Sequence, residues 1–263
     1  MTRRPPRVLV IAGSDSSGGA GIQADIKTVT MLGGYAMTAI TAVTAQNTTG
    51  VQAVELLSAG FVGAQIDSCL DDIGADAVKI GMLGSPAIAH AVADRLERLD
   101  WPIVFDPVMV ATSGAVLADK DTINAFSRLM TLATVVTPNL PELAMLAGTP
   151  CEDEEAIVAA AGALARRSGC AVLAKGGHAE GGTVLDVLVE ADERATRFED
   201  RRIATRHTHG TGCTLASALA TELGRGTTLR HAVGTARRSV RSALENAPGL
   251  GSGSGPLGHQ AVR

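Results

Sequence analysis

The chain has 263 residues, of which 46% are hydrophobic and 19% charged, and its formal net charge is −4. This is the composition of a globular protein that is long enough to bury a large core. It has no basic excess and only 2% aromatic residues to stack on bases, so we expect no nucleic acid partner.

The expected compartment follows from the amino-terminal stretch and the cysteines. In MTRRPPRVLVIAG only about five apolar residues follow one another, too few for a signal peptide, and no run reaches the roughly 18 of a membrane span. The four cysteines, Cys69, Cys151, Cys170 and Cys213, show no CxxC pair and no metal-ligand spacing. We therefore expect a cytoplasmic protein without a membrane partner.

Apolar runs of strand length alternate with runs of helical spacing along the whole chain. In chain order we expect a strand at 7–13, a helix at 20–33, a strand at 37–44, a helix at 61–74, a strand at 77–82, a helix at 85–99, strands at 102–110 and 133–139, a helix at 151–169, a strand at 170–177, a meander over 183–190 and 196–206, and helices at 211–224 and 227–246.

Continuous apolar strands between amphipathic helices predict an α/β fold with a mostly parallel sheet covered on both faces. Without an internal repeat or a convincing linker, we expect a single domain over residues 1–263, with residues 1–6 and 259–263 flexible. Ligands of such folds bind beyond the carboxyl ends of the strands. Polar and glycine residues gather at those ends: Gly13 to Asp15, Thr44 to Asn47, Gly81, Met82, Asp106, Asn139 and Lys175 to Gly177.

The stretch AGSDSSGGAGIQAD, residues 12–25, allows three interpretations. Gly19, Gly21 and Ala24 match the GxGxxA dinucleotide fingerprint, but the acidic residue expected about 20 positions later is absent. Alternatively, the glycines let a small flat ligand approach the backbone, and Asp25 in the following helix accepts its hydrogen bonds. The third interpretation is a plain strand-to-helix turn with a solvated aspartate.

The chain has no GxxxxGK[ST] motif, but HGTGCT at residues 209–214 offers another way to bind phosphate. Glycines that precede a helix expose backbone N–H groups, and the helix end adds partial positive charge, so an anion site is expected there. The same field would depress the pKa of Cys213 and make it a candidate base. The simpler alternative is an ordinary turn followed by a small buried cysteine.

Three further residues are candidates for phosphate and magnesium binding. Glu142, in TPNLPE at residues 137–142, could hold Mg²⁺ through water, although it is also an ordinary acid for a first helical turn. Lys175 at a strand end could meet a phosphate or be a surface lysine. Asp106, also at a strand end, could join the magnesium and water network.

Taken together, the motifs resemble one known family. The stretches AGSDSSGGAGIQAD, TAVTAQNTTGV, KIGML, FDPVMVATSG, TPNLPE, KGGH and HTHGTGCT follow one another as in the hydroxymethylpyrimidine and phosphomethylpyrimidine kinases of thiamine biosynthesis, which are ribokinase-like. The resemblance runs from about residue 7 to residue 258 and includes the glycine-rich ending GSGSGPLGH. It implies a ribokinase-like kinase domain, usually a homodimer, that uses ATP and Mg²⁺. It also implies two successive phosphoryl transfers, to 4-amino-5-hydroxymethyl-2-methylpyrimidine and then to its monophosphate.

The resemblance also assigns roles to individual residues. The pyrimidine would be surrounded by Gly13, Ala20, Asp25, Val43, Gln46 and Met82. The nucleotide phosphates and magnesium would be served by Asn139, Glu142 and Lys175, with Asp106 close by. The anion hole would be formed by Gly210, Thr211 and Gly212, next to Cys213 where many sugar kinases of the superfamily carry an aspartate base.

One departure and three alternatives accompany this hypothesis. Family members often carry lysine in the loop where this chain has Thr112, which leaves the closing charge of that loop in doubt. A pyridoxal kinase is the nearest alternative, but the thiol with which some related enzymes trap an aldehyde is replaced by Ala111. A non-catalytic pyrimidine-binding regulatory domain would not need the phosphoryl-transfer residues. A dehydrogenase would need the missing ribose-binding acid.

Overall fold

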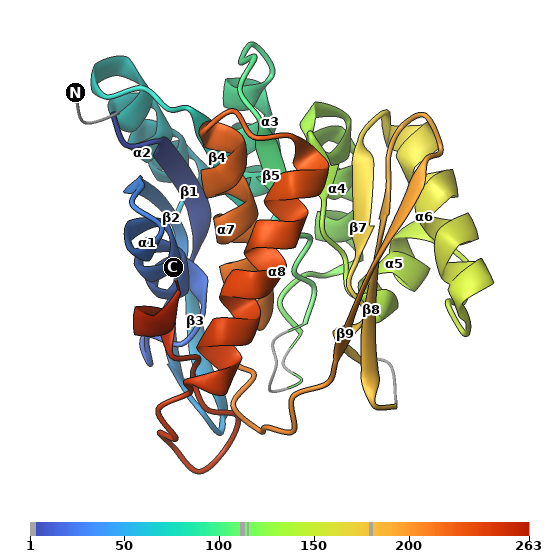
Figure 1. The fold of residues 1–263 in the computed structure, drawn as a ribbon. Helices are drawn as coiled ribbons and strands as arrows, with labels where there is room; N and C mark the ends of the chain where they lie inside the picture. The colour runs from blue at the N-terminus through green and yellow to red at the C-terminus, as the bar shows by residue number, and fades with distance from the viewer. Residues whose placement is uncertain (1–3, 111–113, 115, 179–180, 263) are drawn as a thin grey trace.

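The computed structural model describes residues 4–110, 114, 116–178 and 181–262. Nine strands of this part form one sheet in the order β3-β2-β1-β4-β5-β6-β7-β8-β9 (Figure 1). They are β1 (Arg7–Asp15), β2 (Tyr35–Asn47), β3 (Gly50–Leu56), β4 (Ala77–Ile80), β5 (Ile103–Phe105), β6 (Val135–Val136), β7 (Ala171–Ala174), β8 (Thr183–Val189) and β9 (Ala195–Arg201). Along the sheet from β2 to β7, neighbouring strands are parallel. The pairs β2–β3, β7–β8 and β8–β9 are antiparallel.

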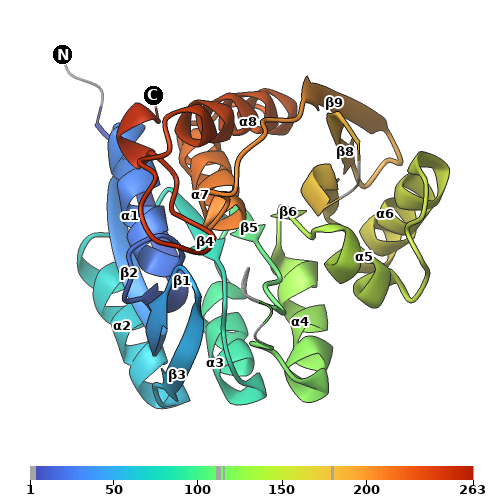
Figure 2. The same cartoon turned by 90° about the horizontal axis from the view of Figure 1, so that it is seen from below.

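Helices cover both faces of the sheet, as Figure 2 shows from below. One face carries α1 (Gly21–Met31), α7 (Thr211–Gly224) and α8 (Leu229–Glu245). The other carries α2 (Ala59–Asp72), α3 (Pro86–Leu96), α4 (Lys120–Leu132), α5 (Leu140–Ala147) and α6 (Glu154–Ser168). Two short 3₁₀ turns complete the elements, η1 (Gly176–His178) and η2 (His259–Ala261). The predicted fold, a mostly parallel sheet flanked by helices on both faces, is confirmed.

The alternation of side chains along β1 explains why its apolar run is continuous. Leu9 and Ile11 pack into the core under α2 to α6, whereas Val8 and Val10 pack under α1, α7 and α8. A strand that is buried on both faces has no polar face to show in its sequence. The same reason accounts for α7, whose residues from Thr214 to Leu223 are all buried.

Among the longer elements, the edge strand β3 and helix α4 were not predicted, and of helix α5 only the first turn was. Strand β3 has the pattern Gly-Val-Gln-Ala-Val-Glu-Leu and is largely exposed, so it lacks the apolar run by which the other strands were found. Helix α4 begins after Asp119, whose carboxylate accepts a hydrogen bond from the Thr122 N–H. This N-cap signal was present in the sequence between the two predicted strands.

Some residues of the two end segments that were expected to be flexible, 1–6 and 259–263, are buried in the structure, whereas Arg4, Pro5 and Gln260 are exposed. Pro6 is buried and its carbonyl accepts from the Tyr35 N–H. His259 and Val262 are buried, and Ser242 Oγ donates to the carbonyl of Ala261 at 2.9 Å. Residues 1–3 and 263 lie outside the described residues.

The glycine-rich segment before η2 is held by close backbone contacts. The Gly253 N–H donates to Thr48 Oγ1 in the turn between β2 and β3, and a Cβ on Gly253 would overlap the Thr48 carbonyl oxygen. The carbonyl of Gly255 accepts from the His209 N–H. Glycine serves here for close approach, not for freedom of movement. Among the described helices none is both long and apolar enough to cross a bilayer.

The packing of the carboxyl-terminal segment gives a stability prediction. We expect Val262→Ala to lower the free energy of unfolding by about 2 kcal/mol, because it removes two methyl groups from a side chain with 0% exposure. Leu250→Ala, in the same segment but 61% exposed, is the control and should change it by less than about 0.5 kcal/mol. Urea titrations of both variants measure this. Equal effects would contradict the described packing.

Candidate active site

One elongated cavity of about 710 Å³ runs along the carboxyl ends of the parallel strands. One end is lined by Gly13, Thr44, Gln46 and Met82, which follow or end β1, β2 and β4. The middle is lined by Asp106, Lys175 and the start of α7. The far end is lined by residues that follow β9 and by Val240 and Leu244 of α8. This is the position that a parallel sheet gives to a ligand site.

The amino end of α7 is open toward the cavity. Its N-cap is Gly210, which has a φ of 86° and offers no side-chain cap, whereas α2 to α6 are each capped by a Ser, Asp or Asn side chain. A Cβ on Gly210 would overlap the carbonyl oxygen of Gly19, so glycine is required by contact as well as by φ. The N–H groups of Gly212 and Cys213 have no acceptor within the helix. This end of α7 can therefore bind an anion.

A hydrogen-bonded pair, Asp15 and His209, fixes the loop before α7. His209 Nε2 lies 2.8 Å from Asp15 Oδ2, and both side chains are buried. Asp15 also accepts from Ser17 and from the N–H groups of Gly19 and Ala20. Burial alone would raise the pKa of Asp15, but the hydrogen bonds from His209, Ser17 and Ala20 outweigh it and lower that pKa to about 2. The pair therefore ties the α7 loop to the glycine-rich loop after β1.

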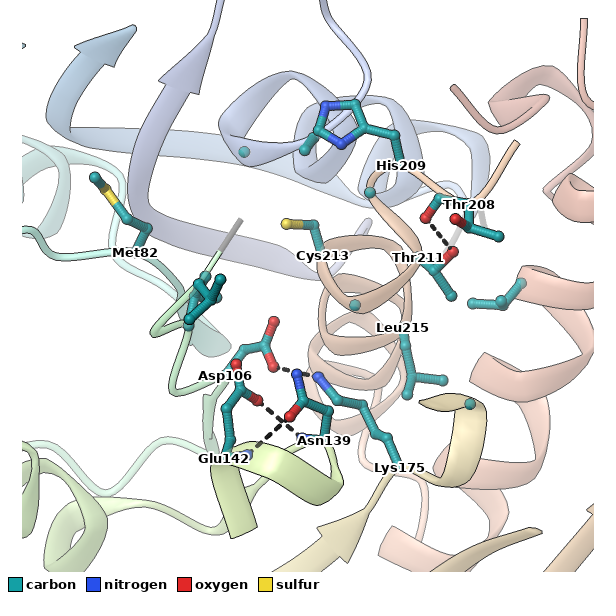
Figure 3. A pocket seen from close by; sticks show the side chains of 18 of the residues that line it. Met82, Asp106, Asn139, Glu142, Lys175, Thr208, His209, Thr211, Cys213 and Leu215 are labelled. Atoms are coloured by element: carbon teal, nitrogen blue, oxygen red, sulfur yellow. Dashed lines mark hydrogen bonds and ion pairs between the residues drawn. The ribbon is translucent and has the colours of Figure 1, made fainter. Parts of the chain in front are cut away.

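The Cys213 thiol is in a different state from the one that the motif predicted. The structure places it in the first turn of α7, pointing to the side of the cavity where Met82 lies (Figure 3). Burial raises its pKa to about 11, and the positive charge of Lys79 acts in the opposite direction. The expectation of a depressed pKa for Cys213 is wrong, because burial and the nearby carboxylates of Asp25 and Asp106 raise that pKa more than the Lys79 ammonium lowers it.

A cluster of polar side chains lies on the other side of α7, with Asp106 at its centre (Figure 3). Lys175 Nζ lies 2.7 Å from Asp106 Oδ1, which also accepts from the Thr137 hydroxyl at 2.9 Å. Both of these hydrogen bonds fall on Oδ1. A Cβ on Gly212 would lie 3.3 Å from Asp106 Oδ2 and 3.3 Å from Lys175 Nζ, so the helix end, a cation and a carboxylate oxygen meet at Gly212.

Asn139 and Glu142 line the cavity but are bonded mainly to each other. Each side chain accepts from the other residue's N–H, at 2.9 and 2.8 Å, which forms the capping box of α5. Burial raises the pKa of Glu142, while Lys175 lowers it and Asp106 raises it further. Within the described residues no three His, Cys, Asp or Glu side chains are grouped so as to hold a metal ion. A magnesium ion here would depend on phosphate and water ligands as well as on carboxylates, as Mg²⁺ commonly does.

Twelve of the predicted site residues line this one cavity. They are Gly13, Ala20, Gln46, Met82, Asp106, Asn139, Glu142, Lys175, Gly210, Thr211, Gly212 and Cys213. Asp25 and Val43 do not line it. Asp25 is fully buried against Lys79 and Ser217, and Val43 is 48% exposed on β2. Ala111 and Thr112 lie outside the described residues.

Three cavity residues were missed by sequence reasoning. Lys79 is a charged residue inside an otherwise apolar strand, and that interruption was a usable signal. His209 stands directly before the Gly-Thr-Gly sequence. Arg237 on α8 is buried, with an ion pair to Asp186 on β8 and another to Asp200 on β9, and nothing in a helical pattern marks such a residue.

The comparisons with known proteins cover nearly the whole chain. A model of the phosphomethylpyrimidine kinase family matches residues 15–258. The hydroxymethylpyrimidine/phosphomethylpyrimidine kinase of Rhizobium meliloti is 47% identical over 255 residues, which are 95% of this chain and 96% of that protein. The thiamine biosynthesis bifunctional protein ThiED of Geobacter sulfurreducens is 46% identical over 98% of this chain, which spans about half (54%) of its length.

Among solved structures, an ADP complex of Bacillus subtilis pyridoxal kinase is similar in fold. Its TM-score is 0.91 at 34% identity, and the match covers 98% of this chain and 99% of that one.

The Asp15–His209 pair predicts how stability depends on pH. Because the pKa of Asp15 is lower in the folded protein than its ordinary 3.8, its contribution is present above pH 4 and is lost as the pH falls toward 2. We expect the free energy of unfolding of Asp15→Asn to be about 2 kcal/mol lower than that of the wild type at pH 7, and this deficit to shrink below pH 4. Urea titrations from pH 7 to pH 2.5 measure it, with the exposed Asp71→Asn as the charge control. A deficit that stays constant with pH would contradict the assignment.

Proposed function

The chain belongs to the phosphomethylpyrimidine kinase family, and on this premise we propose that it is an ATP-dependent kinase of thiamine biosynthesis. It transfers a phosphoryl group first to 4-amino-5-hydroxymethyl-2-methylpyrimidine and then to the resulting monophosphate. The observation that carries the proposal is the open amino end of α7 in the middle of the cavity, with Lys175 and Asp106 on one side and Cys213 facing the other.

The end of the cavity near Met82 suits a small flat acceptor. The Gln46 amide offers a donor and an acceptor, which match the edge of an aminopyrimidine. A Cβ on Gly13 would lie 3.0 Å from Met82 Sδ, so glycine leaves room for a ring beside the methionine. Ala20 and Thr44 complete this end.

The middle of the cavity suits the transferring phosphoryl group. The N–H groups of Gly212 and Cys213 point from the helix end, and the Lys175 ammonium lies beside them. Bound Mg²⁺ would neutralise charge on the phosphate oxygens. Asp106 and Glu142 would hold it through water, and Lys175 and Thr137 leave Asp106 Oδ2 unused. The far end, where Val240 and Leu244 lie among charged residues such as Arg202 and Arg241, would receive the nucleoside.

Cys213 is the candidate proton acceptor. The hydroxymethyl oxygen loses its proton as its bond to phosphorus forms and the bond from phosphorus to ADP breaks, and the Cys213 thiolate would take that proton. A thiol with a pKa of about 11 is ionised in only a small fraction of molecules at neutral pH, but its thiolate is a strong base. The second transfer starts from a phosphate oxygen that is already anionic and needs no base.

A pyridoxal kinase is the second candidate, because the similarity to the Bacillus subtilis enzyme covers nearly the whole chain. A single product assay separates the candidates. Mg-ATP is offered with hydroxymethylpyrimidine, its monophosphate or pyridoxal, and products are identified by mass. We expect the mono- and then the diphosphorylated pyrimidine. Phosphorylated pyridoxal alone would overturn the substrate assignment, and no product from any of the three would favour a non-catalytic regulatory domain.

We further propose a cytoplasmic homodimer. All four cysteines are free thiols, which suits a reducing compartment. The hairpin of β2 and β3 lies at the edge of the sheet and exposes Val43, Val54 and Leu56 by 48%, 41% and 42%. An exposed apolar edge strand is a common pairing surface between subunits. Sedimentation of the wild type and of Val54→Asp tests this: a wild-type monomer would contradict it.

The proposed role of Cys213 gives a prediction for the two transfers. We expect Cys213→Ala to slow the first transfer by about 10² to 10⁴-fold, the usual contribution of a general base, and the second by less than about tenfold. Single-turnover rates with each acceptor measure both steps. Cys170→Ala, at a buried cysteine outside the cavity lining, is the matched control. Equal losses in both transfers would exclude Cys213 as the base.

A further inference from the structure

Lys79 and Asp25 form a buried ion pair that the proposed reaction does not otherwise use. Both side chains have 0% exposure. Lys79 Nζ lies 2.8 Å from Asp25 Oδ2 and 3.0 Å from Oδ1, and Ser217 Oγ donates to Oδ1 at 2.6 Å. A buried pair of this kind rarely improves stability over well-packed apolar residues. Its presence in the core therefore calls for a role beyond stability.

The pair contacts the second turn of α7 through Ser217. Ser217 follows Cys213 by four residues on the same helix, so the two side chains share one face of it. Lys79 lines the cavity, as Cys213 does, whereas Asp25 lies outside the lining. A Cβ on Gly81 would lie 2.8 Å from Lys79 Nζ, so glycine there leaves the space that the ammonium occupies. Of the pair, the lysine therefore borders the cavity that Cys213 also lines, and Asp25 lies outside that lining.

The thiol is surrounded by charges from four elements. Asp25 comes from α1, Lys79 from β4, Asp106 from the end of β5 and Lys175 from the end of β7. Lys79 lowers the pKa of Cys213 more than Asp25 raises it, and Asp106 also raises it. Lys175 is paired with Asp106 at 2.7 Å, and Asp106 lines the cavity. Lys79 differs, because its own partner, Asp25, lies outside the cavity lining.

We propose that Lys79 stabilises the thiolate of Cys213, and that Asp25, held by Ser217, keeps the Lys79 ammonium in place at the cavity that both Lys79 and Cys213 line. Lys79 and Asp25 are then positioning residues for the proton transfer. The substrate hydroxyl gives its proton to the Cys213 thiolate, the resulting thiol later returns that proton to solvent, and Lys79 stays an ammonium throughout. The catalytic meaning of this inference rests on the proposed kinase function, whereas the acidity of the thiol does not.

The test measures the acidity of Cys213 without nucleotide or pyrimidine. Alkylation by iodoacetamide is followed from pH 7 to pH 10.5, and the labelled peptides are quantified by mass spectrometry, because only the thiolate reacts. For Lys79→Gln we expect alkylation of Cys213 at pH 8 to slow by about tenfold or more, the effect of one pKa unit on the thiolate fraction. For Asp25→Asn we expect it to become several times faster. Cys151, on the other side of the sheet, is the internal control and should react alike in every variant.

Alkylation of Cys213 is expected to become slower in Lys79→Gln and faster in Asp25→Asn. These opposite signs distinguish an electrostatic effect on the thiol from a loss of structural support. Loosened packing would expose the thiol and speed its alkylation in both variants, and that result, or unchanged rates, would overturn the inference. If Lys79→Gln does not fold, Lys79→Gln/Asp25→Asn replaces it, since that variant buries no charge. It should still react more slowly than the wild type, because the cation has the larger influence on the thiol. Absence of pyrimidine products would refute the kinase function and leave this result standing.

Discussion

The site depends on a helix end that the protein's own side chains leave unsatisfied. Five helices begin with a Ser, Asp or Asn side chain that accepts from the first turn, but α7 begins with Gly210, whose positive φ and contact with Gly19 exclude a side chain. The free N–H groups face the cavity, where an anion can accept their hydrogen bonds. From Thr214 to Leu223 α7 is buried against α1, α8 and the sheet, which fixes the position of its half-buried amino end.

Around this helix end the charged residues are arranged in two pairs with different exposure. Lys175 and Asp106 lie at strand ends and contact the space beside Gly212, where phosphate oxygens would be. Lys79 and Asp25 are one layer deeper, and of the two only Lys79 reaches the cavity. In a region of low dielectric constant, small differences in distance between cation and anion decide the sign of the local field. A lysine–aspartate pair can therefore have one role at the strand ends and another in the deeper layer.

The sequence predicted the fold because buried parallel strands and amphipathic helices leave strong periodic patterns. The exposed edge strand β3 was missed because its pattern is weak. Helix α4 was missed although its N-cap signal was present. The sequence also predicted which strand ends carry the site, since parallel strands bring Gly13, Asp106 and Lys175 to one edge. It could not predict the depth of a side chain within the helix layer. Asp25 was therefore expected against the ligand, although it lies behind Lys79, and the Cys213 thiol was expected to be acidic, although burial raises its pKa.

The glycine-rich segment near the carboxyl end also shows that amino-acid composition alone does not predict how a segment packs. Glycine and serine predict flexibility, but here Gly253 and Gly255 are glycines because Thr48 and His207 leave no space for a Cβ. This segment also holds the loop before α7, through the bond between the Gly255 carbonyl and the His209 N–H. On a ribosome, residues 250–262 emerge after all nine described strands have been made, so the sheet can form before the loop that precedes α7 is secured. A chain without residues 250–262 would keep most of the described core but would lack the contact that holds the loop before α7.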